Sequence, residues 1–383
     1  MSVRPTIWGA CFLAGLLSGG SHLPALEIEP GQPASWTFYV ENDSFLSTDR
    51  YYTNGIRLTR SFGADGLPRW AHRTRWMEHV LNHVPHCPPG RSDSSCYNFE
   101  TAWTFGQNLY TPENLRTPRL IPDQRPYGAW LYYGNVLTLS KPDRQHSLEI
   151  DAGAVGGSLA LGEPVQRRWH AFLRSVTNSD TPPDPKGWGN QIKNQPGLQL
   201  LYQGRRRFVE RSTQSGLRYF DIVPQVNAAL GTVNVHASVG ATVRLGYNLS
   251  NLFPETIPSF VPPPPESAAI PGIALASYRQ PPPPEVPPEI LTPARSARPW
   301  EAYVFVRADQ RYVAYSAFLD GNLSIFGPSH SVPKEPLVTD LQVGAVLGCR
   351  HWRFSLTMVD RSPEFRAQRT HQNFASITVM HRR

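Results

Sequence analysis

The stretch VNVHASVGATVRLG, residues 233–246, alternates apolar with polar or small residues along its whole length. Successive side chains of an extended strand point to opposite faces, so this stretch would present one apolar and one polar face. The residues expected on the apolar face are Val233, Val235, Ala237, Val239, Ala241, Val243 and Leu245. The pattern is typical of a transmembrane β-barrel, whose outside contacts lipid and whose lumen is polar. Soluble β-sandwiches also alternate, but their strands are usually shorter.

The same alternation recurs along the chain in about twelve segments. Their approximate centres are residues 38, 58, 104, 133, 150, 200, 222, 240, 306, 342, 355 and 377. The composition agrees, because 40% of residues are hydrophobic and only 17% charged, while 29 Gly and 38 Pro supply turns. A closed bacterial barrel requires an even number of strands. The sequence therefore predicts an all-β protein that forms a twelve-stranded antiparallel transmembrane β-barrel in the bacterial outer membrane.

The N-terminus has the pattern of a secretory signal peptide. Arg4 precedes an apolar run from Ile7 to Leu17, and small residues lead to a plausible cleavage site near Ala25. We therefore expect residues 1–25 to be a signal peptide and residues 26–383 to form the outer-membrane barrel. No later stretch approaches the roughly 20 apolar residues of a transmembrane helix, so any membrane crossing would be made by strands.

Charge and cysteines narrow the class further. The net charge of +7 is spread through loop segments, which makes nucleic acid a poor partner for an exported protein and suits either the phosphates of a lipid surface or a basic soluble surface. Cys87 and Cys96 bracket a short loop segment, HCPPGRSDSSC, which predicts a loop disulfide in an oxidising compartment. The spacing matches no usual zinc site.

Strand parity assigns each loop to one side of the membrane. If the first strand rises from the periplasm, residues 42–52, 110–126 and 156–194 form extracellular loops. The Cys87–Cys96 segment and a proline-rich insertion at about residues 253–299, which contains PPPP twice, then lie on the periplasmic side. Periplasmic turns are normally short, so this insertion is either an unusual polyproline-type segment or a sign that the strand count slips.

Two polar clusters in the predicted outer loops are candidates for chemistry. In the first hairpin, parity places Asp43 on the luminal side with Glu41, and Thr53 on the luminal side with Arg57. A polar hairpin of ordinary turn residues is the alternative. In the third outer loop, His170 is a candidate general base that would take a proton from water, although a lone His is more often a simple polar residue.

The sequence contains no GxSxG elbow and no HExxH pair. A serine nucleophile is therefore not expected, and hydrolysis would proceed by activated water with a cation to stabilise the oxyanion. The oxygen ligands Asn42 and Asp43 suit calcium better than zinc.

Several motifs together resemble the lipid A 3′-O-deacylases. They run in order through nearly the whole chain: ENDSF, TDRYYTNGIRL, GQNLYTP, PDQRPYGAWLY, VQRRWHAF, GWGNQIKNQP and the late LDGN. The resemblance implies a twelve-stranded outer-membrane barrel that uses calcium to hydrolyse the 3′-linked acyloxyacyl group of lipid A, with its site between barrel and outer loops. Carried over by motif, the catalytic set is Asn42, Asp43, Thr53 and His170. His170 would activate water, Asn42 and Asp43 would organise calcium or the oxyanion, and Thr53 would position ligand or water.

Two positions depart from the family pattern. The acidic residue that follows the family's His has no clean counterpart, and Asp184 is the nearest candidate, with Asp180 and Glu163 behind it; Asp43 and Asp184 are then the predicted metal ligands. The family's cation in the second outer loop is matched only by Arg116 or Arg119, the predicted substrate-binding residues.

The expected partner is lipid A or lipopolysaccharide in the outer membrane, bound by a monomer. A non-enzymatic pore or lipid-binding barrel, and an outer-membrane phospholipase, are the alternatives.

Overall fold

The computed structural model describes residues 35–43, 51–62, 84, 95–177, 182–250, 300–349 and 351–382. Contacts divide the chain into two compact units, Met1–Gln32 and Pro33–Arg383, and all described residues belong to the second. The predicted signal peptide, Cys87 and the proline-rich insertion lie outside the described residues. Cys96 is disulfide-bonded, and Cys349 is free.

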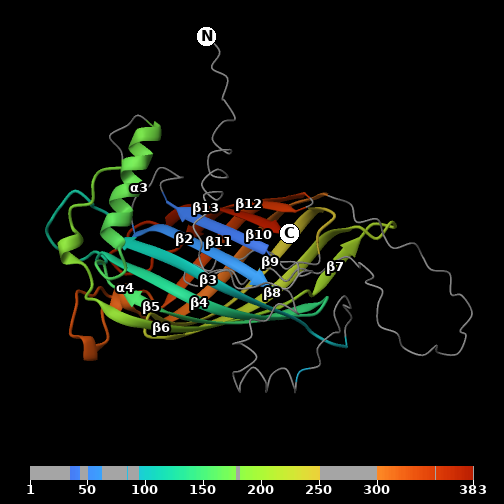
Figure 1. Cartoon of the computed structure of the whole chain (residues 1–383), viewed down its shortest axis with the longest axis horizontal. Helices are drawn as coiled ribbons and strands as arrows, with labels where there is room; N and C mark the ends of the chain where they lie inside the picture. Colours follow the sequence, from blue (N-terminus) through green and yellow to red (C-terminus); the bar gives the residue numbers. More distant parts are fainter. Residues whose placement is uncertain are drawn as a thin grey trace, which may run out of the picture. The chain divides into compact units, whose positions relative to one another are not determined.

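The second unit is a sheet of long antiparallel strands (Figure 1). The first half of the sheet comprises β1 (Ser35–Asn42), β2 (Tyr51–Phe62), β3 (Asn98–Thr111), β4 (Gly128–Ser140), β5 (Arg144–Val155) and β6 (Gln195–Arg206). The second half comprises β7 (Val209–Ser212), β8 (Arg218–Gly231), β9 (Asn234–Tyr247), β10 (Trp300–Ser316), β11 (Leu337–Cys349), β12 (Trp352–Arg361) and β13 (Gln372–Arg382).

The sheet closes on itself. β1 pairs with β13, and β6 pairs with β8 through the register from Gln199 opposite Gly231 to Arg205 opposite Gln225. The short β7 pairs with the remaining part of β8, so β6 and β7 together occupy one position in the ring. The predicted twelve-stranded barrel is therefore confirmed, and each predicted segment centre falls inside one of the twelve long strands.

Burial follows the predicted alternation, with lipid-facing residues exposed and luminal residues buried. In β9, Val239 and Leu245 are 60% and 55% exposed, whereas Thr242 and Arg244 are fully buried. Val233 is an exception to the prediction. It precedes the strand, is 1% exposed, and its carbonyl accepts a hydrogen bond from the backbone N–H of Ala317 at 2.9 Å. It packs in the core beneath an outer loop and does not face lipid.

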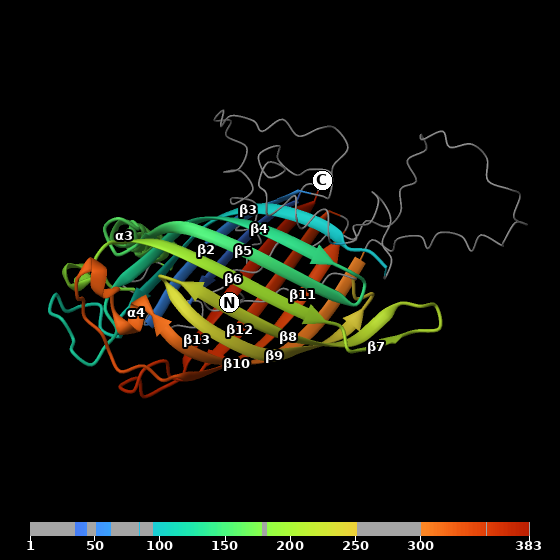
Figure 2. The ribbon, with the colours of Figure 1, turned by 90° about the horizontal axis from the view of Figure 1, so that it is seen from below.

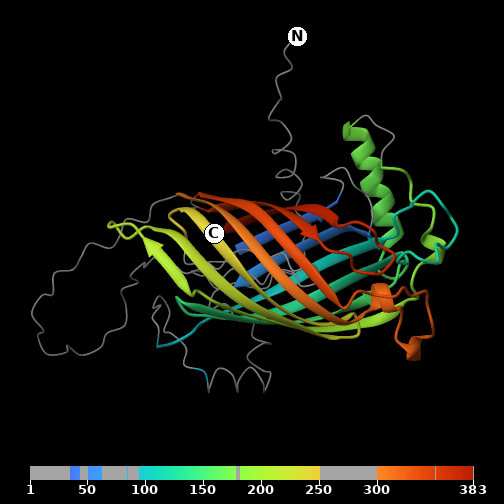
Figure 3. The same ribbon diagram turned by 180° about the vertical axis from the view of Figure 1, so that it is seen from behind.

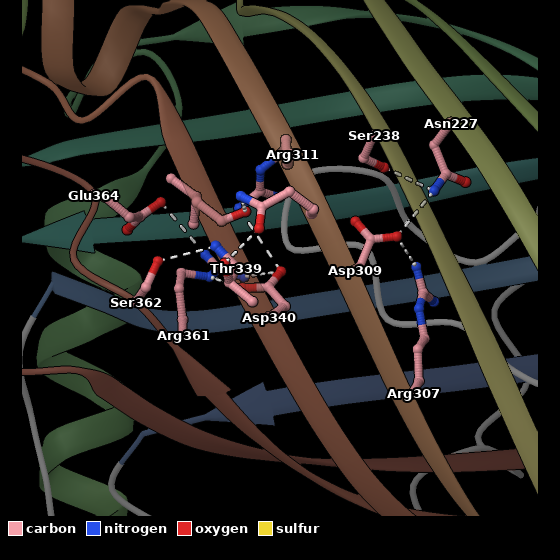
Figure 4. Close-up of polar contacts among 12 residues, drawn as sticks. Asn227, Ser238, Arg307, Asp309, Arg311, Thr339, Asp340, Arg361, Ser362 and Glu364 are labelled. Atoms are coloured by element: carbon pink, nitrogen blue, oxygen red, sulfur yellow. Dashed lines mark hydrogen bonds and ion pairs between the residues drawn. The ribbon is translucent and has the colours of Figure 1, made fainter.

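The lumen is lined with paired charges. Arg57 of β2 reaches across to Glu149 of β5, with Nη1 to Oε1 at 3.0 Å. Figure 4 shows two further groups, one around Asp340 and one around Asp309. The ion pairs in these groups are Arg361 with Asp340, Arg311 with Asp340, Arg361 with Glu364, and Arg307 with Asp309. Because a buried charge is tolerated when it is paired and hydrogen-bonded, the arginines and carboxylates fill the interior together.

The helices gather at one end of the barrel, which Figures 2 and 3 show from two further directions. They are α3 (Gly162–Thr177), the 3₁₀ turn η3 (Trp188–Asn190), α4 (Ala317–Asp320) and the 3₁₀ turn η4 (Ser324–Phe326). Strand parity puts the connections after β1 and β3 at this same end, as predicted. Among the described residues, no helix is long and apolar enough to cross a membrane.

Candidate active site

A row of buried residues crosses the outer wall of the barrel near this end. In β2, Arg57 faces the lumen. Asn54 lies three residues earlier, so the alternation of side chains along the strand places it on the outside of the barrel. Its register partners in the neighbouring strands, Asn42 and Leu109, share that face, and Leu109 is in turn paired with Ala129. All four are at most 2% exposed. Positions that would otherwise contact lipid are therefore covered by protein.

Over Leu109 and Ala129 the cover is the helical loop, residues 156–194, of which the structure describes 156–177 and 182–194. Gln107, which also points outward, donates from Nε2 to the carbonyl of Ala160 at 2.6 Å. Leu109 and Ala129 pack with Ala160 and with Trp188 of η3 in one apolar cluster, and Val165 of α3 packs against that cluster. The helical loop thus folds down over β3 and β4, and the space between it and the barrel wall is the candidate site.

α3 is held at its start by close packing. A Cβ added to Gly162 would lie 2.3 Å from the Trp188 ring. That ring is itself fixed, because its Nε1–H donates to Oε1 of Gln166 at 2.8 Å. Only a residue without a side chain fits between the helix and the indole.

Replacing Gly162 with Ala is therefore expected to push α3 away from the wall. Forcing extra atoms into a packed site costs about 1–3 kcal/mol, which would raise trypsin cleavage at Arg167 and Arg168 by about tenfold in the folded protein. Gly189→Ala is the matched control, because nothing lies within 4 Å of a Cβ at that glycine. Equal cleavage of the two variants would contradict the packing role of Gly162.

His170 lies on the buried side of α3 and is 1% exposed. Its Nδ1 is 2.8 Å from the carbonyl oxygen of Pro183. A carbonyl oxygen only accepts, so Nδ1 carries the proton and the neutral ring has its lone pair on Nε2. Burial lowers the pKa of His170 below its ordinary value, 6.5; the Pro183 hydrogen bond and the charge of Asp184 oppose this, and the charge of Arg174 adds to it. The ring is therefore neutral near pH 7, as a general base must be.

Asp184 does not orient His170 directly. Its side chain is 53% exposed, and Oδ1 accepts from Nη2 of Arg174 at 2.9 Å. The backbone carbonyl of the preceding residue, Pro183, takes the orienting position instead. In the part of the chain that the structure describes, no group of three or more His, Cys, Asp or Glu side chains could hold a metal ion. The predicted pairing of Asp43 with Asp184 in a metal site stays a prediction.

The first hairpin contributes the other predicted residues. Asn42 ends β1 and Asp43 follows it; both are buried. Thr53 is also buried, and its Oγ1 is 2.7 Å from that of Thr111. The register of β2 shifts between Tyr52 and Asn54, and the Tyr52 hydroxyl donates to the luminal carboxylate of Glu41. Because the bulge interrupts the alternation, parity no longer assigns Thr53 to the side of Arg57.

Sequence reasoning missed Asn54. It is 2% exposed, and neither atom of its side-chain amide has a hydrogen-bond partner among the described residues. A buried amide left unpaired costs about 1–3 kcal/mol, so its place beside Asn42 in the row points to a ligand or water contact. The signal in the sequence was its position directly after Thr53 in TNG.

The second outer loop holds the predicted substrate-binding residues, Arg116 and Arg119, whose role stays a prediction. Arg116 and Arg119 are both exposed, and only Arg119 lines a hollow on that loop. The buried cation of this loop is Arg125, which the sequence analysis did not single out although it lies in the motif PDQRPYGAWLY. It is 1% exposed, its Nη1 is 2.8 Å from Oε2 of Glu364, and its guanidinium lies 4.8 Å from the centre of the Tyr110 ring.

Comparisons with known proteins bear on the fold and the family. The solved structure of LpxR from Salmonella typhimurium is similar over 91% of this chain and 99% of that one, with a TM-score of 0.61 and 20% sequence identity. The β-domain of the Bordetella autotransporter BrkA is more distant, with a TM-score of 0.40 and 8% identity over 92% of this chain and 98% of that one. No curated protein matches the chain. The family described as "Outer membrane protein LpxR" matches residues 10–383. The chain therefore belongs to the LpxR family of outer membrane proteins.

Proposed function

We propose that the protein is a hydrolase that removes the 3′-O-linked acyloxyacyl group from lipid A. The observation that carries the proposal is His170, a buried, neutral imidazole whose proton is held on Nδ1 by Pro183. Its helix covers the outer wall of the barrel, where a lipid substrate can enter from the membrane. Membership of the LpxR family supports lipid A as the substrate class.

In the proposed reaction, Nε2 of His170 takes a proton from water, and the resulting hydroxide oxygen attacks the ester carbonyl carbon. The tetrahedral intermediate then collapses as the bond to the sugar 3′ oxygen breaks. The imidazolium returns its proton to that oxygen, which leaves a free hydroxyl and a released fatty acid. Negative charge develops on the carbonyl oxygen, and the amide N–H groups of Asn42 and Asn54 and the hydroxyl of Thr53 are the candidate donors to it.

The residues of the first hairpin fit a hard cation such as calcium in their chemistry. Asp43 supplies a carboxylate, and the side-chain oxygens of Asn42 and of the unpaired Asn54 are amide oxygens, ligands that calcium accepts. Asp184 fits less well, since it is exposed and paired with Arg174. Calcium bound by the hairpin residues would supply positive charge to stabilise the oxyanion.

The competing phospholipase activity is tested by substrate competition. The purified protein is given lipid A and glycerophospholipid together in mixed detergent micelles, and released acyl chains and lysophospholipid are quantified by mass spectrometry. We expect acyloxyacyl release from lipid A and no lysophospholipid. Lysophospholipid as the main product would overturn the proposed substrate class.

The pore alternative is tested by conductance. Single-channel conductance that persists after Asn42, Asp43 and His170 are changed would favour a pore over the hydrolase.

The pKa of His170 sets the pH below which activity falls. This low-pH part of the activity profile is the acid limb. The base works only when neutral, so activity falls as pH drops through this pKa, which lies below 6.5. Replacing Arg174 with Gln removes a positive charge that lowers this pKa, and it also releases Asp184, whose charge raises it. The acid limb of kcat/KM should therefore move to higher pH. Arg167→Gln is the control, because that exposed arginine pairs with Glu163 instead. An unchanged acid limb in Arg174→Gln would contradict the assignment of His170 as the base.

A further inference from the structure

The apolar side of α3 packs on the barrel at Val165 and is exposed to solvent further along the helix. Phe172 and Val176 are 54% and 65% exposed, and Leu161, which directly precedes the helix, is 50% exposed. At 100° per residue Phe172 and Val176 lie about 40° apart on the helix. Leu161 has a φ of 55° and lies outside this helical periodicity, at the start of the helix. We call Leu161, Phe172 and Val176 the apolar flank. The buried residues Gln166 and His170 lie on a different side of the same helix.

The rest of the exposed surface of α3 is polar or small. Ala171 and Arg167 are exposed on the side of the helix away from the apolar flank. Arg168 and Ser175, also exposed, lie at the border between the two sides. α3 is therefore amphipathic on its solvent-accessible surface alone, which its contacts with the barrel do not explain.

The position of α3 indicates that the apolar flank is in contact with the membrane. Figures 1 and 3 show the helix at the outer end, standing steeply across the long axis of the barrel, and Figure 2 shows it nearly end on. A helix in this direction runs along the membrane plane. Only residues 156–161 separate it from β5, whose lipid-facing Ile150 is 42% exposed; Leu159, in that connection, is 54% exposed. The apolar flank thus continues the lipid-facing surface of the barrel.

We propose that α3 is an interfacial helix whose apolar flank lies in the outer leaflet of the membrane, with Arg168 bound to lipid phosphate. Helices of this kind place aromatic and aliphatic residues at the boundary between headgroups and acyl chains, and their arginines extend to the phosphates. Immersion of the apolar flank fixes the rotation of α3 about its axis. That rotation keeps Gln166 and His170 against the barrel wall.

The test measures the depth of single side chains in the protein without the expected signal peptide, residues 26–383, folded into vesicles of phosphatidylethanolamine and phosphatidylglycerol. In a Cys349→Ser background, nitroxide labels are placed at Phe172→Cys and Val176→Cys, with Ala171→Cys and Ser175→Cys as matched controls on the same helix. Collisions with oxygen, which concentrates in lipid, and with a water-soluble nickel complex are measured by electron paramagnetic resonance. We expect labels 172 and 176 to favour oxygen by several-fold and labels 171 and 175 to favour nickel.

Two results would overturn the proposal. Nickel accessibility at all four positions would place the helix clear of the membrane. Protection at 172 and 176 that grows with the ratio of protein to lipid would assign the apolar flank to a second copy of the chain. The measurement reads position only, so its failure leaves the proposed hydrolysis standing.

The phosphate contact of Arg168 is tested by comparison with the neighbouring Arg167. Arg168→Gln should lower the preference of label 172 for oxygen, because the phosphate contact that holds the helix is lost, whereas Arg167→Gln should leave it unchanged. Equal effects of the two substitutions would overturn the phosphate contact.

Discussion

Replacing His170 with Gln is expected to lower kcat/KM for release of the acyl chain by about 10²- to 10⁴-fold, the usual contribution of a general base. Gln is similar to His in size and polarity but has no basic nitrogen, so the substitution removes the base with little change in side-chain volume. The measurement is single-turnover release of fatty acid from lipid A in detergent micelles, with heat-modifiable migration on gels as the check that the barrel is folded. Activity within a few-fold of the unmodified protein would remove His170 from the mechanism.

Asp184→Asn distinguishes the role of His170 as the base from the role of its acidic neighbour, Asp184. Asp184 is half exposed and bound to Arg174, so its replacement should shift the acid limb of activity to lower pH and leave the plateau rate nearly unchanged. A loss as large as that of His170→Gln would instead make Asp184 the acidic partner that the family pattern expects.

The second large effect is expected at Glu364. Its carboxylate is bound by Arg125 of the second outer loop and by Arg361 of β12, and all three side chains are at most 2% exposed. Glu364→Ala leaves Arg125 without its only ion-pair partner in the described residues, and breaking a buried pair in this way costs about 3–5 kcal/mol. The free energy of unfolding, measured by urea titration in lipid vesicles with tryptophan fluorescence, should fall by that amount.

The double variant Arg125→Met with Glu364→Met provides the control. It removes the Arg125 charge together with its partner, so its destabilisation should be smaller than the summed losses of the single variants Arg125→Met and Glu364→Met. Additive losses would show that Arg125 and Glu364 act independently and would contradict the ion pair that joins the second outer loop to the connection between β12 and β13.

The barrel was predictable because lipid imposes a simple rule on every strand. Residues such as Val239 and Leu245 must be apolar, whereas Thr242 and Arg244 between them need not be, and the resulting alternation marks each strand without knowledge of its partners. Parity then places the outer loops at one end.

α3 was not predicted, and the reason is physical. The side of a helix that packs on protein usually shows as an apolar stripe, but here the packed side carries Gln166 and His170, and much of the apolar surface faces outward. The face occupied by Thr53 could not be predicted either, because a bulge in β2 between Tyr52 and Asn54 interrupts the alternation of side chains on which the prediction depends.

The polar partners within the site depend on contacts that no local pattern records. Arg125 and Glu364 are 239 positions apart in the chain. The group that orients His170 is the backbone carbonyl of a proline, and because every residue has a backbone carbonyl, no residue type in the sequence indicates it. The motif resemblance led to Asn42, Asp43, Thr53 and His170, but it did not single out Asn54 or Arg125, which only burial and missing or unexpected partners reveal.

The most direct test of the proposed function is the mass of lipid A from a bacterium whose own lipid A keeps its 3′ acyl chains. Expression of this protein should remove one acyloxyacyl unit from lipid A, and expression of the folded His170→Gln variant should leave the mass unchanged. A full complement of acyl chains in cells that carry the folded, unmodified protein in their outer membrane would contradict lipid A deacylation.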